Sequence, residues 1–174
     1  MTDATALTLD ELREVAAYAA ASAEPALHLF ESEHPEDDRP RLALDRALAF
    51  ATGGRRVAAL RVLAAGAHRA AREAHTPAAA EAAMASGHAA AAAYLHPLAQ
   101  ATQVKHILGS AACAARAFEL VAGDDHAVGY TEIERARTRA STTVIAVLRR
   151  YPRAPRGRSR TAELLSDLDR ALRT

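Results

Sequence analysis

The side chains that could do chemistry in this chain gather around one weakly charged segment. Residues 82–104 carry no charged group. If residues 96–113 form one helix, His96 and Gln103 share a face, His106 lies on the adjacent face, and Lys105 points elsewhere. Such imidazole, amide and amine groups can bind a small ligand or a partner. The candidate binding set is therefore His88, Tyr94, His96, Gln103, Lys105 and His106, with no catalytic residue assigned.

Two interpretations of this polar set stay open. Polar groups in an apolar setting are usually hydrogen-bonded, so the set can be a structural network that sets helix register. Alternatively, the set lines a pocket or a partner surface. Lys105 favours this second interpretation, because it is the only lysine among 22 basic residues. His68 and His88 have the same alternatives, as satisfied interior histidines or as an interacting pair.

The sequence favours neither a metal nor a cofactor. A helical di-metal site needs paired Glu-x-x-His motifs, and Glu31 with His34 supplies a single copy inside an acidic loop. Cys113 is the only cysteine and lies among alanines, which is typical of a small core residue. Nucleotide-binding, zinc-protease and serine-hydrolase motifs are absent. We therefore expect no cofactor, no metal site and no enzymatic activity.

The charge is unevenly distributed, although the net charge is only +1. Residues 1–87 carry 9 basic and 13 acidic groups, whereas residues 88–174 carry 13 basic and 8 acidic groups. Arginines follow Tyr151 in a segment with proline, glycine and serine, which favours a solvated linker over a nucleic-acid contact. The acidic loop is the candidate partner surface, and its residues are Glu33, Glu36, Asp37 and Asp38.

Helical periodicity predicts an all-α fold, a single compact alanine-rich bundle of about seven helices. The chain holds 47 alanines, and small residues on facing stripes let helix axes approach closely. The uncharged stretch of residues 82–104 is expected to be the central, buried helix. Pro97 either kinks one long helix there or divides two.

Capping signals predict where individual helices begin. Thr8 with Glu11 forms a capping box that starts the first helix, within which Pro25 predicts a kink or a break. Thr131 with Glu134 forms a second capping box, which is expected to precede one helix that extends to residue 150.

Residues 1–152 are expected to form the bundle domain. Residues 153–174 are expected to form a basic linker and a short C-terminal helix, packed on or trailing the same domain. Residues 82–104 are too weakly apolar to span a membrane. The chain does not open on a basic region followed by an apolar core, so a cytoplasmic location is expected. Exposed alanine stripes would suit a helical homodimer.

Several runs of residues resemble one known family, the Imm-5-like putative immunity proteins of actinobacteria. The run at 87–109 is the most specific, because composition alone would not produce Tyr-Leu-His-Pro followed by Gln-Val-Lys-His. The resemblance covers nearly the whole chain. The runs that carry it are A-H-R-A-A-R-E-A (67–74), G-H-A-A-A-A-A-Y-L-H-P-L-A-Q-A-T-Q-V-K-H-I-L-G (87–109), A-G-D-D-H-A-V-G (122–129) and V-L-R-R-Y-P (147–152).

The resemblance implies an all-helical cytoplasmic protein that binds and neutralises a cognate toxin without catalysis. It brings no established catalytic role for His96 or Lys105. Inhibitors of nuclease toxins are often strongly acidic, so the nearly neutral charge speaks against a nuclease target. The alternative is an enzyme or small-ligand-binding protein that uses a polar cluster: His88, His96, Lys105 and His106.

Overall fold

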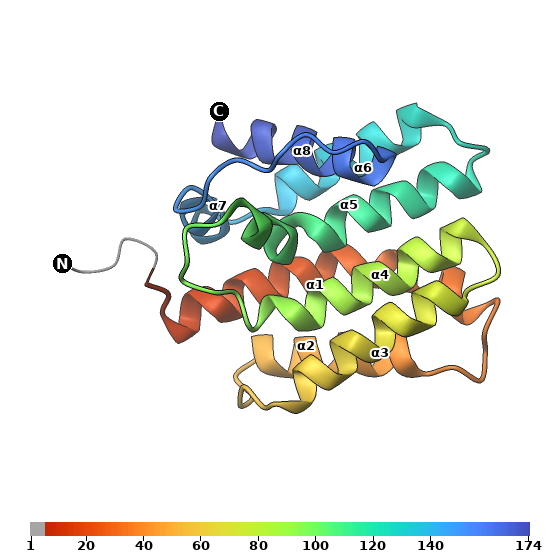
Figure 1. Ribbon diagram of the computed structural model, residues 1–174, viewed down its shortest axis with the longest axis horizontal. Helices are drawn as coiled ribbons and strands as arrows, with labels where there is room; N and C mark the ends of the chain where they lie inside the picture. Colours follow the sequence, from red (N-terminus) through yellow and green to blue (C-terminus); the bar gives the residue numbers. More distant parts are fainter. Residues whose placement is uncertain (1–5) are drawn as a thin grey trace.

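The computed structural model describes residues 6–174, and these residues form eight α-helices and one 3-10 turn (Figure 1). The described residues include no strand, so the predicted all-α class is confirmed, with eight helices in place of about seven. The elements are α1 (Leu9–Glu31), α2 (Arg39–Ala51), α3 (Ala59–Glu73), α4 (Pro77–Ala92), η1 (Ala101–Gln103), α5 (Val104–Val121), α6 (His126–Arg139), α7 (Thr142–Leu148) and α8 (Arg160–Arg173).

Helices α1 and α4 form the centre of the bundle. Helix α4 packs on α1, α2, α3 and α5. Figure 1 shows α2 and α3 on one side of the central pair, with α5, α6 and α8 on the other. Helix α4 can be covered on several sides because most of its buried residues are alanine, which lets neighbouring backbones approach closely. Bulkier side chains such as Phe30 and Phe50 fill the remaining core.

Helix α1 begins as the sequence predicts. The Thr8 hydroxyl accepts a hydrogen bond from the Glu11 amide at 3.2 Å, and the Glu11 carboxylate accepts one from the Thr8 amide at 2.8 Å. This reciprocal pair completes the capping box. The sequence predicted a kink or a break at Pro25. The break does not occur, because α1 continues to Glu31. Pro25 is exposed, so water can replace the hydrogen bond that its missing amide would have made.

Pro97 divides the uncharged stretch into two helices, one of the two outcomes that the sequence allowed. Helix α4 ends at Ala92, residues 93–100 are not helical, and η1 then leads into α5. The prediction of one buried helix over residues 82–104 is therefore wrong beyond Ala92. The prolyl ring explains this, because it disfavours helical backbone at His96 and removes one amide donor.

The capping box predicted at Thr131 and Glu134 is wrong. Helix α6 begins earlier, because the Asp125 carboxylate accepts a hydrogen bond from the Ala127 amide at 2.9 Å. Thr131 therefore lies inside α6, where its hydroxyl donates to the Ala127 carbonyl at 2.9 Å. Ser141 then caps α7, so the single helix expected to reach residue 150 is two helices.

Helix α8 packs against α5 and α6. Packing on the bundle is one of the two arrangements that the sequence left open for the C-terminal helix. Its apolar stripe of Leu164, Leu168 and Leu172 is buried, and the spacing of four residues keeps the three side chains on one face. From residue 6 to residue 174, no helix is both long enough and apolar enough to cross a bilayer.

Candidate functional site

Three histidines from three successive long helices form the centre of the candidate site. His68 comes from α3, His88 from α4 and His106 from α5, and we call them the histidine row. The rings of His68 and His88 meet edge to face, with their centroids 5.2 Å apart. The two therefore form the interacting pair that the sequence left as one alternative.

Glycine on the next helix makes room for two of these rings. The His68 ring lies against Gly87 of α4, where an added methyl group would overlap it. The His88 ring lies against Gly109 of α5, where an added Cβ would lie 2.9 Å from it. Since interiors are closely packed, a side chain at either glycine would displace an imidazole.

The histidine row lacks the hydrogen bonds that buried imidazoles normally make. Three fully buried ring nitrogens have no partner within residues 6–174: His68 Nε2, His88 Nδ1 and His106 Nδ1. Of the two alternatives left open for His68 and His88, the described contacts show the interacting pair and no hydrogen bond to these ring nitrogens. Buried polar atoms almost always have a partner, so three exceptions in one row indicate a special environment.

The electrostatics keep the histidine row neutral. Burial, followed by repulsion from His68, His106 and Lys105, lowers the pKa of His88 to about 3. Burial is also the main reason why the pKa values of His68 and His106 lie below the ordinary value of 6.5. Each ring therefore carries one N–H and one lone pair at pH 7, and can donate or accept a hydrogen bond.

An open groove of about 570 Å³ lies beside the row, between α3 and the start of α5. Its apolar lining is Ala64, Ala65 and Ala91, and its lining contains no carboxylate. On the rim, the Arg61 guanidinium lies 4.1 Å from the centroid of the Tyr94 ring, and Arg56 lies 5.4 Å from the same centroid. These are cation–π distances. We call this hollow the histidine groove; its polar lining is Arg61, His68, Tyr94, His96 and His106.

The structure separates the residues predicted as one polar cluster. His96 precedes α5, so the prediction that it shares a helical face with Gln103 is wrong. Gln103 is buried and holds the loop, because its side-chain oxygen accepts a hydrogen bond from the His96 amide at 2.9 Å. The Tyr151 hydroxyl donates to the His96 carbonyl at 2.6 Å. Tyr94, His96 and His106 therefore line the groove, whereas Gln103 positions the loop.

His88 and Lys105 line a second hollow of about 290 Å³ between α4, α5 and α8. Cys113 also lines it and is buried, as predicted. Burial and the nearby Glu81 carboxylate raise the pKa of the Cys113 thiol well above its ordinary value. The thiol is therefore not poised to act as a thiolate nucleophile.

Sequence reasoning missed Arg61, which lines the groove, and Arg56, which lies beside Tyr94. Their partner, Tyr94, is distant in the sequence and follows the end of α4. One signal was available, since Arg61, His68 and Arg72 are spaced seven and four residues apart and so fall on one face of α3.

Glu33, His34 and His75 bring potential metal-ligand atoms within 4.8 Å of one another. The Glu33 carboxylate accepts hydrogen bonds from the amides of His75 and Thr76, at 2.9 and 3.1 Å, and lies 3.1 Å from His34 Nε2. These contacts tie the loop after α1 to the turn before α4. These hydrogen bonds explain why the three side chains lie together, as a structural contact between two loops.

The remainder of the predicted acidic surface is partly engaged within the chain. Asp37 pairs with Arg39 at 2.6 Å, and Arg39 also bridges to Glu73 at 2.5 Å. Glu36 and Asp38 are exposed, and neither has an ion-pair partner in the described chain. Two of the four predicted carboxylates, Glu36 and Asp38, are thus free to meet a partner.

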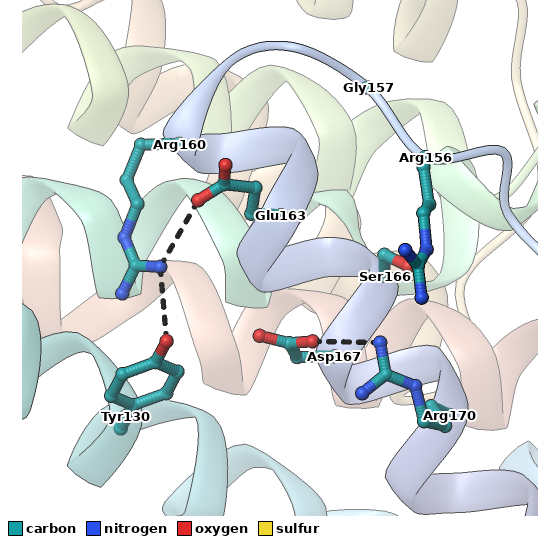
Figure 2. A pocket seen from close by; sticks show the side chains of 8 residues that line it. All are labelled: Tyr130, Arg156, Gly157, Arg160, Glu163, Ser166, Asp167 and Arg170. Carbon is teal, nitrogen blue, oxygen red and sulfur yellow. Dashed lines mark hydrogen bonds and ion pairs between the residues drawn. The ribbon is translucent and has the colours of Figure 1, made fainter.

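A polar pocket of about 350 Å³ lies where the linker before α8 meets α6 and α8 (Figure 2). Arg160 lies 4.8 Å from the centroid of the Tyr130 ring and pairs with the buried Glu119 carboxylate at 2.6 Å. Arg170 pairs with Asp167 at 3.1 Å. Most of the positive charge in this pocket is therefore neutralised within the chain.

The fold and the groove define a class: a small, alanine-rich helical protein with a basic groove beside buried imidazoles. A family model described as Imm-5 like putative immunity protein matches residues 5–143, and the chain belongs to that family. The match includes the whole histidine row and ends inside α7, so α8 lies beyond it. No curated protein and no solved structure matches the chain.

Proposed function

We propose that this protein binds a cognate toxin protein and neutralises it by covering its surface, without catalysis. Membership of the immunity-protein family carries this proposal. Such a protein would act in the cytoplasm of the cell that it protects. Arginine and tyrosine are the side chains that most often dominate binding energy at protein interfaces, and the groove presents Arg61 against Tyr94.

Two features of the polar groups support a non-catalytic role. Nucleophilic catalysis needs a nucleophile activated by a base that a third group orients. Cys113 is buried with a raised thiol pKa, which makes it a poor nucleophile. Within residues 6–174, no hydrogen bond or ion pair joins the histidine row to a carboxylate, so no carboxylate orients an imidazole as a general base.

The acidic loop is a second proposed contact. Reversing the charge of Glu36 and Asp38 tests it well, because neither carboxylate has an ion pair within the described residues that the change would break. Complex formation weakened at unchanged helicity would support the loop as a contact, and unchanged affinity would remove it from the interface. Asp37 is left intact, because it holds Arg39.

The function itself is tested by co-expression in a sensitive host with the toxin-domain candidates encoded beside the gene. Survival, together with a complex that persists through gel filtration, is the expected result. Failure to protect against every neighbouring candidate would contradict the proposal.

A small-ligand function is the alternative, favoured by the groove of about 570 Å³ that three histidines, Arg61 and Tyr94 line. A screen of anionic and neutral metabolites by thermal shift tests it. The alternative requires a ligand that raises the melting temperature of the wild-type protein and leaves the His106→Gln variant unchanged.

A further inference from the structure

The histidine groove has one unpaired cation in its lining, Arg61, and three more unpaired cations close to its lining residues. Arg56 lies beside Tyr94, Arg72 acts on His68 and Lys105 acts on His106. Arg61 and Arg72 lie on the same face of α3 as His68, Arg56 precedes that helix, and Lys105 follows the loop on the other side. These four cations are exposed, and none forms an ion pair in the described part of the chain. In the pocket of Figure 2, by contrast, Arg160 and Arg170 pair with the carboxylates of Glu163 and Asp167.

The interior of the groove adds hydrogen-bonding capacity to this charge. His68 and His106 line it, and neither imidazole makes a hydrogen bond within residues 6–174. One nitrogen of each ring is buried between helices, so the other nitrogen is the one that can meet a ligand. A neutral imidazole can donate its N–H to a carboxylate oxygen, and an arginine can donate two parallel N–H groups to the same carboxylate. The small alanine side chains in its lining leave room for the methylene groups of an acidic side chain.

We infer that the histidine groove anchors an acidic segment of the partner protein, with one or two aspartate or glutamate side chains seated between Arg61 and the imidazoles. This inference rests on the proposed function and names the chemistry of the partner. A protein carboxylate is favoured over a nucleic acid, because the groove is a local hollow and the net charge of the chain is only +1.

The imidazoles give the site a characteristic dependence on pH. A carboxylate seated beside His68 or His106 favours the protonated ring, so binding takes up a proton. Affinity should therefore rise as the pH falls from 7.5 to 6.0. The groups that face these rings are Arg61 and Arg72 from α3, His88 from α4, His96 from the loop before α5, and Lys105 from α5. All are neutral or positive, so they oppose protonation until the anion binds.

The test uses the full chain and a short fluorescein-labelled polyglutamate peptide, followed by fluorescence anisotropy at low salt. Reversing the charge of Arg61 and Arg72 together should weaken binding at least about tenfold. The matched control reverses Arg153 and Arg158, two exposed arginines without ion pairs in the described chain, and should change affinity less than about twofold. The double variant His68→Gln, His106→Gln should bind without the rise in affinity at pH 6.0.

Three results would overturn the inference: no peptide binding by the wild-type chain, an equal loss in the control pair, or tighter binding of a short DNA duplex than of the peptide. The co-expression assay separates this inference from the proposed function. If the wild-type protein protects and the Arg61, Arg72 reversal protects equally well, the groove is not the anchor although the function stands. If no toxin is neutralised, the peptide measurement still decides whether the groove binds acidic chains.

Discussion

Acidification should destabilise this protein through His88. Its pKa is about 3 in the folded chain, and the ordinary value is 6.5. As the pH falls below 6.5, the unfolded chain takes up the proton first, so stability is lost between pH 6.5 and about 3. From pH 7.5 to 5.0 this one group lowers the free energy of unfolding by about 2 kcal/mol. His68 and His106 add to the loss, because burial lowers their pKa values too.

The assay is urea unfolding followed by circular dichroism at both pH values. The variant His88→Gln removes the buried imidazole, so its loss of stability between pH 7.5 and 5.0 should be about 2 kcal/mol smaller than that of the wild type. The difference between two pH values is compared because the substitution also changes stability at neutral pH. His126→Gln, which removes an exposed imidazole outside the row, is the matched control. Equal losses in the wild type and in His88→Gln would refute the reasoning.

Three further substitutions test a close helix contact, a buried ion pair and a hydrogen bond that holds a loop. Gly87→Ala should be less stable than Gly66→Ala by at least about 1 kcal/mol in thermal unfolding, because a methyl group at Gly87 overlaps an imidazole whereas the nearest atom to one at Gly66 is 3.9 Å away. Glu119→Gln should cost about 3 kcal/mol in urea unfolding, since it leaves the guanidinium of Arg160 without its buried partner. Tyr151→Phe should cost about 1 kcal/mol and speed hydrogen exchange in residues 96–103, because it removes the hydroxyl that holds the loop at 2.6 Å.

Helix starts were predictable where the capping group and its amide lie within one turn. Thr8 and Glu11 form their capping box because both bonds are local. The box predicted at Thr131 failed because Asp125 offers an equally good local cap six residues earlier. A pattern of residue types cannot rank two competing caps when both precede helix-forming residues.

The site was predictable as a set of residue types but not as a geometry. The polar residues of 88–106 do surround hollows, yet Pro97 places His96 in a loop, so the predicted helical face does not exist. The contact between Arg61 and Tyr94 joins α3 to the end of α4, and no local pattern reveals such a pairing. The roles of Gly87 and Gly109 could not be predicted either, because each glycine makes room for an imidazole that packs on it from another helix.

Glu119 links the matched family region to the segment beyond it. Its carboxylate is fully buried in α5, and although burial opposes ionisation, hydrogen bonds from Arg160 and Arg116 hold its pKa below the ordinary value. Gly129 of α6 packs against this carboxylate so closely that a Cβ there would overlap it. Arg160 comes from α8, outside the matched residues 5–143. A charge buried in α5 thus takes one of its two counter-ions from α8, and we propose that residues 153–174 fold as part of the same unit as the bundle.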